Sequence, residues 1–150
     1  MLLKEIYDNN HYVFHESAED WREAIRLGCK PLEADDTIEP EYADVLIEVV
    51  EKHGPYIVLI PGVAMPHSTE NAEGANGTAI GFMRLAKPVS FDENDPSKDA
   101  QVFFTLVSTN PDEHMENMQK LYTILTNEEV VEKLKDCTSG EELLEIDALL

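Results

Sequence analysis

The stretch IEPEYADVLIEVVEKHGPYIVLIPGVAMPH, residues 38–67, decides how the rest of the chain is interpreted. Its first half repeats apolar residues at the spacing of one helix face: Tyr42, Val45, Leu46, Val49 and Val50. Pro40 suits a first-turn position and Gly54-Pro55 ends the pattern, so a helix is expected between them. The run Tyr56–Ile60 is apolar and rich in β-branched residues, which predicts a strand buried on both faces and stopped by Pro61-Gly62.

Further elements flank this stretch on both sides. Thr78–Leu85 and Gln101–Ser108 have strand composition, and the turn-rich segment Phe91–Asp99 is expected to join them. On the N-terminal side, Ser17 and Asp20 form a capping-box pattern ahead of apolar residues at helical spacing, which predicts a helix from near Ala18. Pro31 removes an amide donor, so this helix is expected to stop by Lys30 or to kink there.

The C-terminal third is predicted to be helical. One helix is marked by Met115, Met118, Tyr122 and Leu125. Thr126 with Glu129 predicts the cap of a second helix, and Ser139 with Glu142 predicts a capping box before the last one. Because helices precede and follow the strands along the chain, the fold class is predicted to be α/β around a central sheet.

Length and charge narrow the range of functions. The chain has 150 residues, 43% of them hydrophobic, which predicts one compact domain spanning residues 1–150. Its formal charge is −20, which argues against binding to nucleic acid or anionic lipid and favours basic partners. The apolar stretch Tyr56–Met65 is too short to span a bilayer, and charges at Lys4 and Glu5 interrupt any signal peptide. A cytoplasmic location is therefore expected.

Among the five histidines, His67 has the most distinctive surroundings. In IPGVAMPHSTE, residues 60–70, it follows a buried strand, a Pro-Gly break and a second proline, which places an imidazole just beyond a strand end. Open α/β sheets bind ligands at such ends, and two prolines reduce the entropy lost in holding a side chain in place. For His11, His15 and His53 a structural or surface role is expected.

The residues around His67 match no common catalytic or binding motif. HxxxH, HxH and CxxC patterns are missing, GxSxG is missing although Ser68 is adjacent, and the glycines fit neither GxGxxG nor GxxxxGK[ST]. No metal and no cofactor are therefore expected. Cys29 and Cys137 lie far apart and are expected to be free, buried thiols. From these patterns alone, a hydrogen-bonded loop histidine without chemical duty remains the simplest interpretation of His67.

From Ala18 to Ile146 the chain resembles the enzyme IIA component of the phosphoenolpyruvate-dependent sugar phosphotransferase system, in its mannitol/fructose-type class. Four segments carry the resemblance: PGVAMPHS (residues 61–68), the Gly81-Phe82 strand, DEHMENMQKLYTIL (residues 112–125) and NEEVVEKLKDCTSGEELLEI (residues 127–146). Residues 38–67 are most similar to the L-ascorbate-specific branch, especially GPY before the strand and AMPH after it.

This resemblance implies a three-layer α/β/α sandwich, with helices on both faces of a central mixed sheet. It also implies a route in which the phosphocarrier HPr phosphorylates His67, which passes the group to a cysteine of enzyme IIB for use at the membrane enzyme IIC. Family precedent suggests Nε2 as the modified atom. A neutral imidazole suits this role because its ordinary pKa of about 6.5 leaves it nucleophilic near neutral pH.

His114 is the second site residue that the resemblance implies. Pro111-Asp112 is typical of a helix start, which puts His114 in a first turn where it could donate to phosphoryl oxygens. The alternative is that His114 only packs at the edge of a core. Ser68 is a further candidate donor, and the strand cations Arg84 and Lys87 are candidates to balance phosphate charge.

Several questions stay open from the sequence. Val63–Met65 either form an exposed contact patch for partners or pack inward. A regulatory module that accepts phosphate without moving sugar is an alternative function. An acidic interaction protein that binds a basic partner is a third, and it does not need His67 at all. The sugar and the oligomeric state, including a homodimer, are not determined.

Overall fold

The computed structural model describes residues 2–69 and 71–150. Within them the helices are α1 (Leu2–Asp8), α2 (Trp21–Ala34), α3 (Glu41–His53), α4 (Pro111–Leu125), α5 (Glu128–Lys135) and α6 (Gly140–Asp147). The strands are β1 (Tyr12–His15), β2 (Val58–Ile60), β3 (Gly62–Ala64), β4 (Ala79–Val89) and β5 (Ala100–Val107), with a short 3-10 helix at Pro96–Lys98 before β5.

The five strands form one mixed sheet in the order β1-β4-β5-β3-β2. β1 runs parallel to β4 and β3 runs parallel to β5, whereas the β4–β5 and β2–β3 pairs are antiparallel. Side chains alternate between the two faces of the sheet, so that Phe82 and Phe104 pack in one buried cluster and Met83 and Phe103 in the other.

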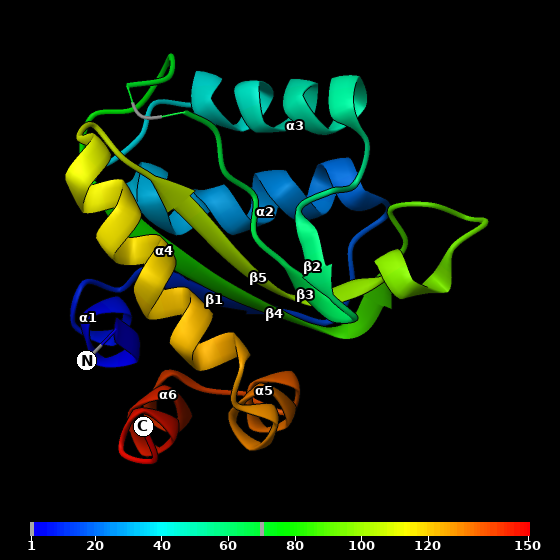
Figure 1. Cartoon of the computed structure of the whole chain (residues 1–150), viewed down its shortest axis with the longest axis vertical. Coiled ribbons are helices and arrows are strands. Elements are labelled where there is room, and N and C mark those ends of the chain that lie inside the picture. Colours follow the sequence, from blue (N-terminus) through cyan, green and yellow to red (C-terminus); the bar gives the residue numbers. More distant parts are fainter. Residues whose placement is uncertain (1, 70) are drawn as a thin grey trace.

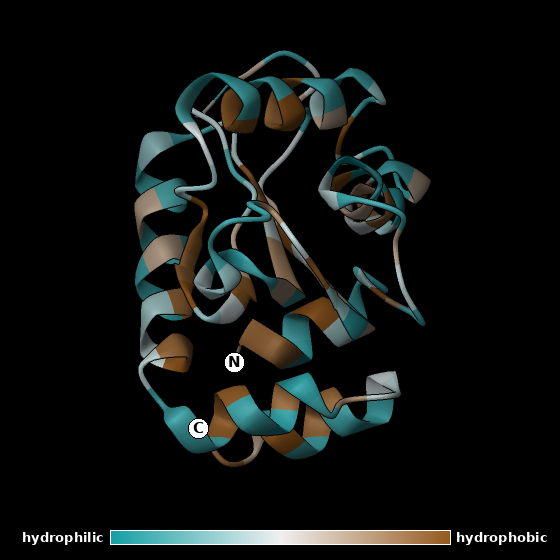
Figure 2. Ribbon diagram, turned by 90° about the vertical axis from the view of Figure 1, so that its right-hand side faces the viewer, coloured by the Kyte–Doolittle hydropathy of each residue, from teal (hydrophilic) through white to brown (hydrophobic). Residues whose placement is uncertain are grey.

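Helices cover both faces of the sheet (Figure 1). α2 and α3 pack on one face, where Ile25, Leu32 and Leu46 belong to the same cluster as Met83. α1, α4, α5 and α6 pack on the other, where Leu121 and Leu134 join the cluster of Phe82. Hydrophobic residues, brown in Figure 2, mark the strands between these two layers. The α/β fold class and its three-layer arrangement around a mixed sheet are thus confirmed.

The prediction for Tyr56–Ile60 is wrong in its extent and its burial. Strand β2 comprises only Val58–Ile60 and lies at the edge of the sheet, where Leu59 is 55% exposed. Pro61 ends β2, but Gly62 turns the chain directly into β3, which supplies the inner, parallel neighbour of β5. A short apolar run predicts a central strand, yet here Tyr56 and Ile57 lie in a turn and only Val58–Ile60 form a strand, at the edge of the sheet.

Helix ends follow local chemistry, with shifts of a few residues. α2 begins at Trp21 rather than near Ala18, because Asp20 caps it by accepting from the Glu23 amide at 2.9 Å. It continues through Pro31 to Ala34. Thr126 does not cap α5; it ends α4, and Asn127 caps α5 instead. Ser139 caps α6 as predicted.

The N-terminal residues contribute two elements that sequence patterns did not indicate. α1 has seven residues and β1 has four, which is too short for a clear periodicity. β1 nevertheless pairs with β4 along its length and closes one edge of the sheet. The strand predictions for the two long central strands are confirmed within a few residues, as β4 and β5.

Candidate functional site

His67 lies where the chain leaves the sheet after β3. The parallel β3–β5 ladder is extended past Ala64 by one hydrogen bond, in which the Leu106 amide donates to the Pro66 carbonyl at 2.9 Å. His67 is the next residue and is half-buried. Its imidazole therefore lies at the carboxyl ends of two parallel strands, which is where open α/β sheets bind ligands.

One ring nitrogen of His67 already makes a hydrogen bond to the backbone. Nδ1 lies 2.6 Å from the Met65 backbone carbonyl, within the same turn of chain. A carbonyl oxygen can only accept, so Nδ1 carries the proton in this bond. In the neutral ring Nε2 then has the free lone pair, which makes Nε2 the nucleophilic atom.

Tyr56 packs edge-on against the His67 ring, with centroids 5.7 Å apart and planes at 81°. The phenol is 41% exposed, and partial burial raises the pKa of Tyr56. The tyrosine precedes β2 by two residues, and its ring also meets His53 at the end of α3. The sequence signal for Tyr56 pointed to a strand interior, so its place beside the imidazole could not be read from the pattern.

His114 lies in the first turn of α4, which starts four residues after β5 ends. It is half-buried, and the turn is fixed by Asn110, whose side chain accepts from the Asp112 and Glu113 amides. The fold thus brings both histidines to the carboxyl end of the β3–β5 pair, although they are 47 positions apart in sequence, at 67 and 114. Among the described residues, no hydrogen bond joins the two rings.

Arg84 and Lys87 lie away from the carboxyl ends of β3 and β5. β4 runs antiparallel to β5, so Ala79 pairs with Val107 at the carboxyl end of β5 while Arg84 pairs with Val102. Five residues of strand separate Val102 from Val107, about 17 Å. The Arg84 guanidinium also bonds the Lys135 carbonyl at 2.8 Å. The expectation that these cations balance charge at His67 is therefore wrong.

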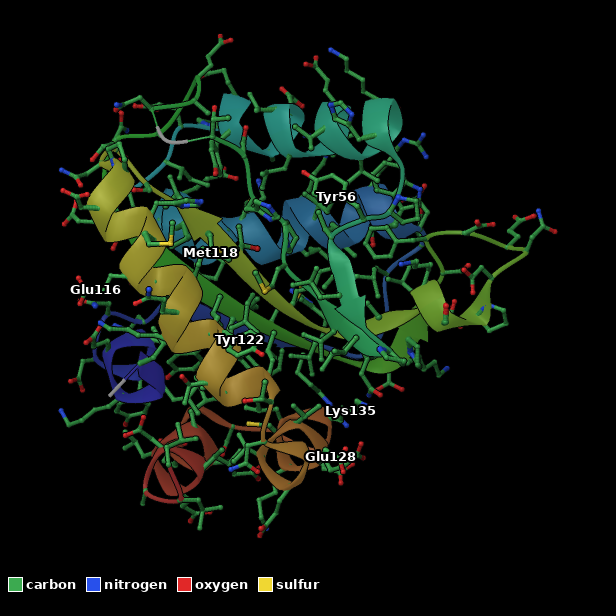
Figure 3. The ribbon with its side chains drawn as sticks, in the orientation of Figure 1. Tyr56, Glu116, Met118, Tyr122, Glu128 and Lys135 are labelled. Carbon is green, nitrogen blue, oxygen red and sulfur yellow. The ribbon has the colours of Figure 1, made fainter. Side chains whose placement is uncertain are left out.

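Val63–Met65 pack inward. All three residues are at most 2% exposed, so the exposed-patch alternative for this segment is wrong. Other elements supply exposed apolar residues: Tyr56, which packs on the His67 ring, and Leu59, Met115 and Tyr122 are between 41% and 71% exposed. A groove of about 580 Å³ runs between β2 and α4, and its lining includes Leu59, Met118 and Tyr122. Figure 3 labels Met118 and Tyr122 on α4, and Tyr56 just before β2.

In the part of the chain that the structure describes, neither the two cysteines nor any cluster of potential metal ligands offers a second reactive group beside His67. Cys29 and Cys137 are free and buried, as predicted. Burial raises the pKa of Cys29 to about 12 and that of Cys137 to about 11, so both are protonated thiols near neutral pH. Within residues 2–69 and 71–150, no three His, Cys, Asp or Glu side chains cluster as metal ligands, and no helix has the length and hydropathy of a membrane span.

Residues 5–147 match the family model described as phosphoenolpyruvate-dependent sugar phosphotransferase system, EIIA 2. The chain belongs to this family. A curated relative, the ascorbate-specific PTS system EIIA component of Escherichia coli strain K12, is 31% identical over 148 residues, which cover 97% of this chain and 94% of the relative. This EIIA is therefore a phosphotransferase component with relatives in the ascorbate-specific branch.

Solved structures agree with this EIIA assignment. The mannitol-specific cryptic phosphotransferase enzyme IIA of E. coli superposes with a TM-score of 0.83 at 29% identity, covering 97% of each chain. The complex of the E. coli mannitol enzyme IIA with its phosphorylated enzyme IIB includes a chain that matches with a TM-score of 0.72 at 25% identity, covering 95% of this chain and 96% of that one.

Proposed function

We propose that this EIIA is the phosphoryl-carrier subunit of a system for L-ascorbate uptake, and that His67 carries the group. The strongest support is the hydrogen bond of 2.6 Å between His67 Nδ1 and the Met65 carbonyl. This bond leaves Nε2 as the nucleophile, just beyond the carboxyl end of β3. The ascorbate assignment rests on curated relatives such as the one at 31% identity. The reaction takes place in the cytoplasm, between HPr and enzyme IIB.

The chemistry consists of two balanced transfers. In the first, the Nε2 lone pair of His67 forms a bond to the phosphorus of phospho-HPr, while the donor's N–P bond breaks and its imidazole keeps the electron pair. In the second, a cysteine thiolate of enzyme IIB attacks the phosphorus and the His67 N–P bond breaks. The phosphorylated IIB then serves the sugar bound at enzyme IIC. Such transfers pass through loose transition states, so alignment matters more than a base.

His114 is proposed to stabilise the transferring group. It stands in the first turn of α4, where the helix N-terminus favours an anion, and it lies beyond the same strand end as His67. A protonated or Nε2–H imidazole there donates to the equatorial oxygens, which carry the developing charge. This role does not require contact between the rings before phosphate arrives.

The groove between β2 and α4, whose lining includes Met65 two residues before His67, supports docking of both partners. Its lining includes three apolar side chains from separate elements, Leu59, Met65 and Met118. Exposed apolar residues that gather around a reactive group are typical of a protein–protein contact surface. HPr and enzyme IIB must use the same approach in turn, because each has to bring its reacting atom to one nitrogen.

Phosphorylation by phosphoenolpyruvate, enzyme I and HPr tests the proposal, with intact-mass measurement as the readout. The wild-type chain is expected to gain one phosphoryl group, and His67→Gln is expected to gain none. His114→Gln is expected to gain it about 100-fold more slowly. His15→Gln, on the opposite edge strand, is the control and keeps the wild-type rate.

Transfer onward distinguishes the transport role from a regulatory one. Phospho-EIIA incubated with an ascorbate-type enzyme IIB is expected to lose its phosphoryl group to the IIB cysteine. A chain that is phosphorylated on His67 but transfers to no such IIB would be a regulatory module instead. A His67→Gln chain that still accepts the group would show that another residue is the carrier.

A further inference from the structure

Tyr42 reaches from α3 to the strand end beside His67. It is the second residue of α3 and only 1% exposed, and its hydroxyl donates to the Leu106 carbonyl at 2.6 Å. The helix positions of the sequence assign Tyr42 to the core, which accounts for its ring but not for its hydroxyl. A buried hydroxyl with so short a bond to a strand carbonyl has a specific structural role.

The hydrogen bond from Tyr42 to Leu106 lies where the β3–β5 ladder would otherwise continue. In a parallel pair, a residue donates from its amide to one partner carbonyl and accepts at its carbonyl from an amide two residues further along. The Leu106 amide donates to the Pro66 carbonyl, so the next bond of a regular ladder would join the Ser68 amide to the Leu106 carbonyl. The Tyr42 hydroxyl takes that carbonyl instead.

The Ser68 backbone lies close enough to the Tyr42 hydroxyl to affect its ionisation. Burial raises the pKa of the Tyr42 phenol, and a hydrogen bond from the Ser68 backbone opposes that rise. The hydroxyl therefore occupies the carbonyl that would otherwise accept from the Ser68 amide. His67 lies between Pro66, whose carbonyl accepts from the Leu106 amide of β5, and Ser68, whose place on the Leu106 carbonyl is taken by the Tyr42 hydroxyl.

The start of α3 is itself held firmly. The Glu39 amide donates to the Gly74 carbonyl at 2.8 Å, and Gly74, at φ +88°, approaches so closely that a Cβ would lie 2.7 Å from the Tyr42 nitrogen. In Figure 1 the starts of α3 and α4 and the segment that follows β3 all lie at one end of the sheet. The hydroxyl is thus presented from a fixed point rather than from a mobile side chain.

We propose that Tyr42 is a positioning residue for His67: its hydroxyl replaces the next bond of the β3–β5 ladder and so sets where the imidazole leaves the sheet. This role rests on His67 being the phosphoryl carrier. Without the hydroxyl, the Leu106 carbonyl is free to accept from the Ser68 amide, and closing that bond shifts the His67 backbone. A shift of about 1 Å at a reacting group can cost about 100-fold in rate.

Tyr42→Phe tests the proposal because it deletes one oxygen atom and keeps the buried ring. We expect the maximal rate of phosphoryl acceptance to fall 10- to 100-fold, with the apparent KM for phospho-HPr within twofold of the wild type. Ile47→Val, in the buried face of the same helix, is the control, since it weakens packing without reaching the loop. A Tyr42→Phe rate within twofold of the wild type, or an equal loss in Ile47→Val, overturns the proposal.

NMR separates this proposal from the carrier function. In Tyr42→Phe we expect the Ser68 amide resonance and the ¹⁵N resonances of the His67 ring to shift, while Ile47→Val leaves them in place. If the wild type accepts no phosphoryl group, the carrier function fails, yet these spectra still decide whether Tyr42 positions the loop. Unchanged spectra in Tyr42→Phe refute the positioning role.

Discussion

Glycines at positions 62 and 140 are required for different physical reasons. Gly62 has φ +90°, a backbone region that side chains with a Cβ disfavour, and this lets the chain turn from β2 into β3 after Pro61 alone. Gly140 begins α6 with an ordinary backbone, but a Cβ there would lie 2.5 Å from the ring and the hydroxyl of Tyr12. One glycine is needed for conformation and the other for space.

Gly140→Ala is therefore expected to destabilise the protein by about 1–3 kcal/mol, because the Tyr12 ring has to move. Thermal or urea unfolding measures this change in the free energy of unfolding. Gly77→Ala is the matched control, since its Cβ would meet only the Thr37 methyl at 3.7 Å, an ordinary contact. Equal stabilities for the two variants would contradict a steric role of Gly140.

At the scale of elements, helix α4 has one apolar side that packs into the core and another that is exposed to solvent. It packs Leu121, Ile124 and Leu125 into the core. The residues that made it recognisable in the sequence include Met115 and Tyr122, which are 61% and 71% exposed. The helix therefore carries an apolar side that no other described element covers, and Met118 and Tyr122 on α4 line the groove.

Tyr122→Ser is expected to raise the apparent KM for phospho-HPr about tenfold while leaving the rate at saturation unchanged, because an aromatic residue at an interface often contributes more than 1 kcal/mol. Since the side chain is mostly exposed, the melting temperature should stay close to that of the wild type. Leu149→Ser, also exposed but at the C-terminus, is the control and should leave KM unchanged. A normal KM in Tyr122→Ser would remove α4 from the docking surface.

The molecule as a whole is strongly acidic. It has 31 Asp and Glu against 11 Lys and Arg, which gives the formal charge of −20. Many of the cations already pair with carboxylates at the surface, such as Arg26 with Asp44 at 2.7 Å and Lys4 with Asp8 at 2.7 Å. The excess negative charge repels itself in the folded state, and the same field attracts a basic donor surface.

Salt should act on stability and on rate in opposite directions. Between 10 mM and 0.5 M NaCl at pH 7, screening of the self-repulsion is expected to stabilise the fold by about 1 kcal/mol, which corresponds to about 2–4 °C in Tm. The second-order rate of phosphorylation by HPr is expected to fall over the same range. Closer to the pI of about 4.3, for example at pH 5, the gain in Tm should shrink. A Tm that falls with salt at pH 7 would contradict net repulsion.

The sequence by itself determined the α/β class, the two long central strands and the cap of α6, and it singled out His67 as the candidate phosphoryl carrier. These features are local: a helix period, a strand composition, a capping side chain two or three residues from its amide, or a motif on one loop. Asp20 and Ser139 act within their own turns, so their role does not depend on the rest of the fold. The same local information identified the family.

Only the tertiary structure decided which residues share the site. β2 is an edge strand, Arg84 lies at the far end of the sheet, and the Tyr42 hydroxyl enters a ladder 64 residues away at Leu106. Strand order and register are long-range pairings, and periodicity carries no information about which end of which strand meets another. Apolar spacing on α4 likewise predicted a helix but not that part of its apolar side faces solvent, because exposure depends on what packs against it.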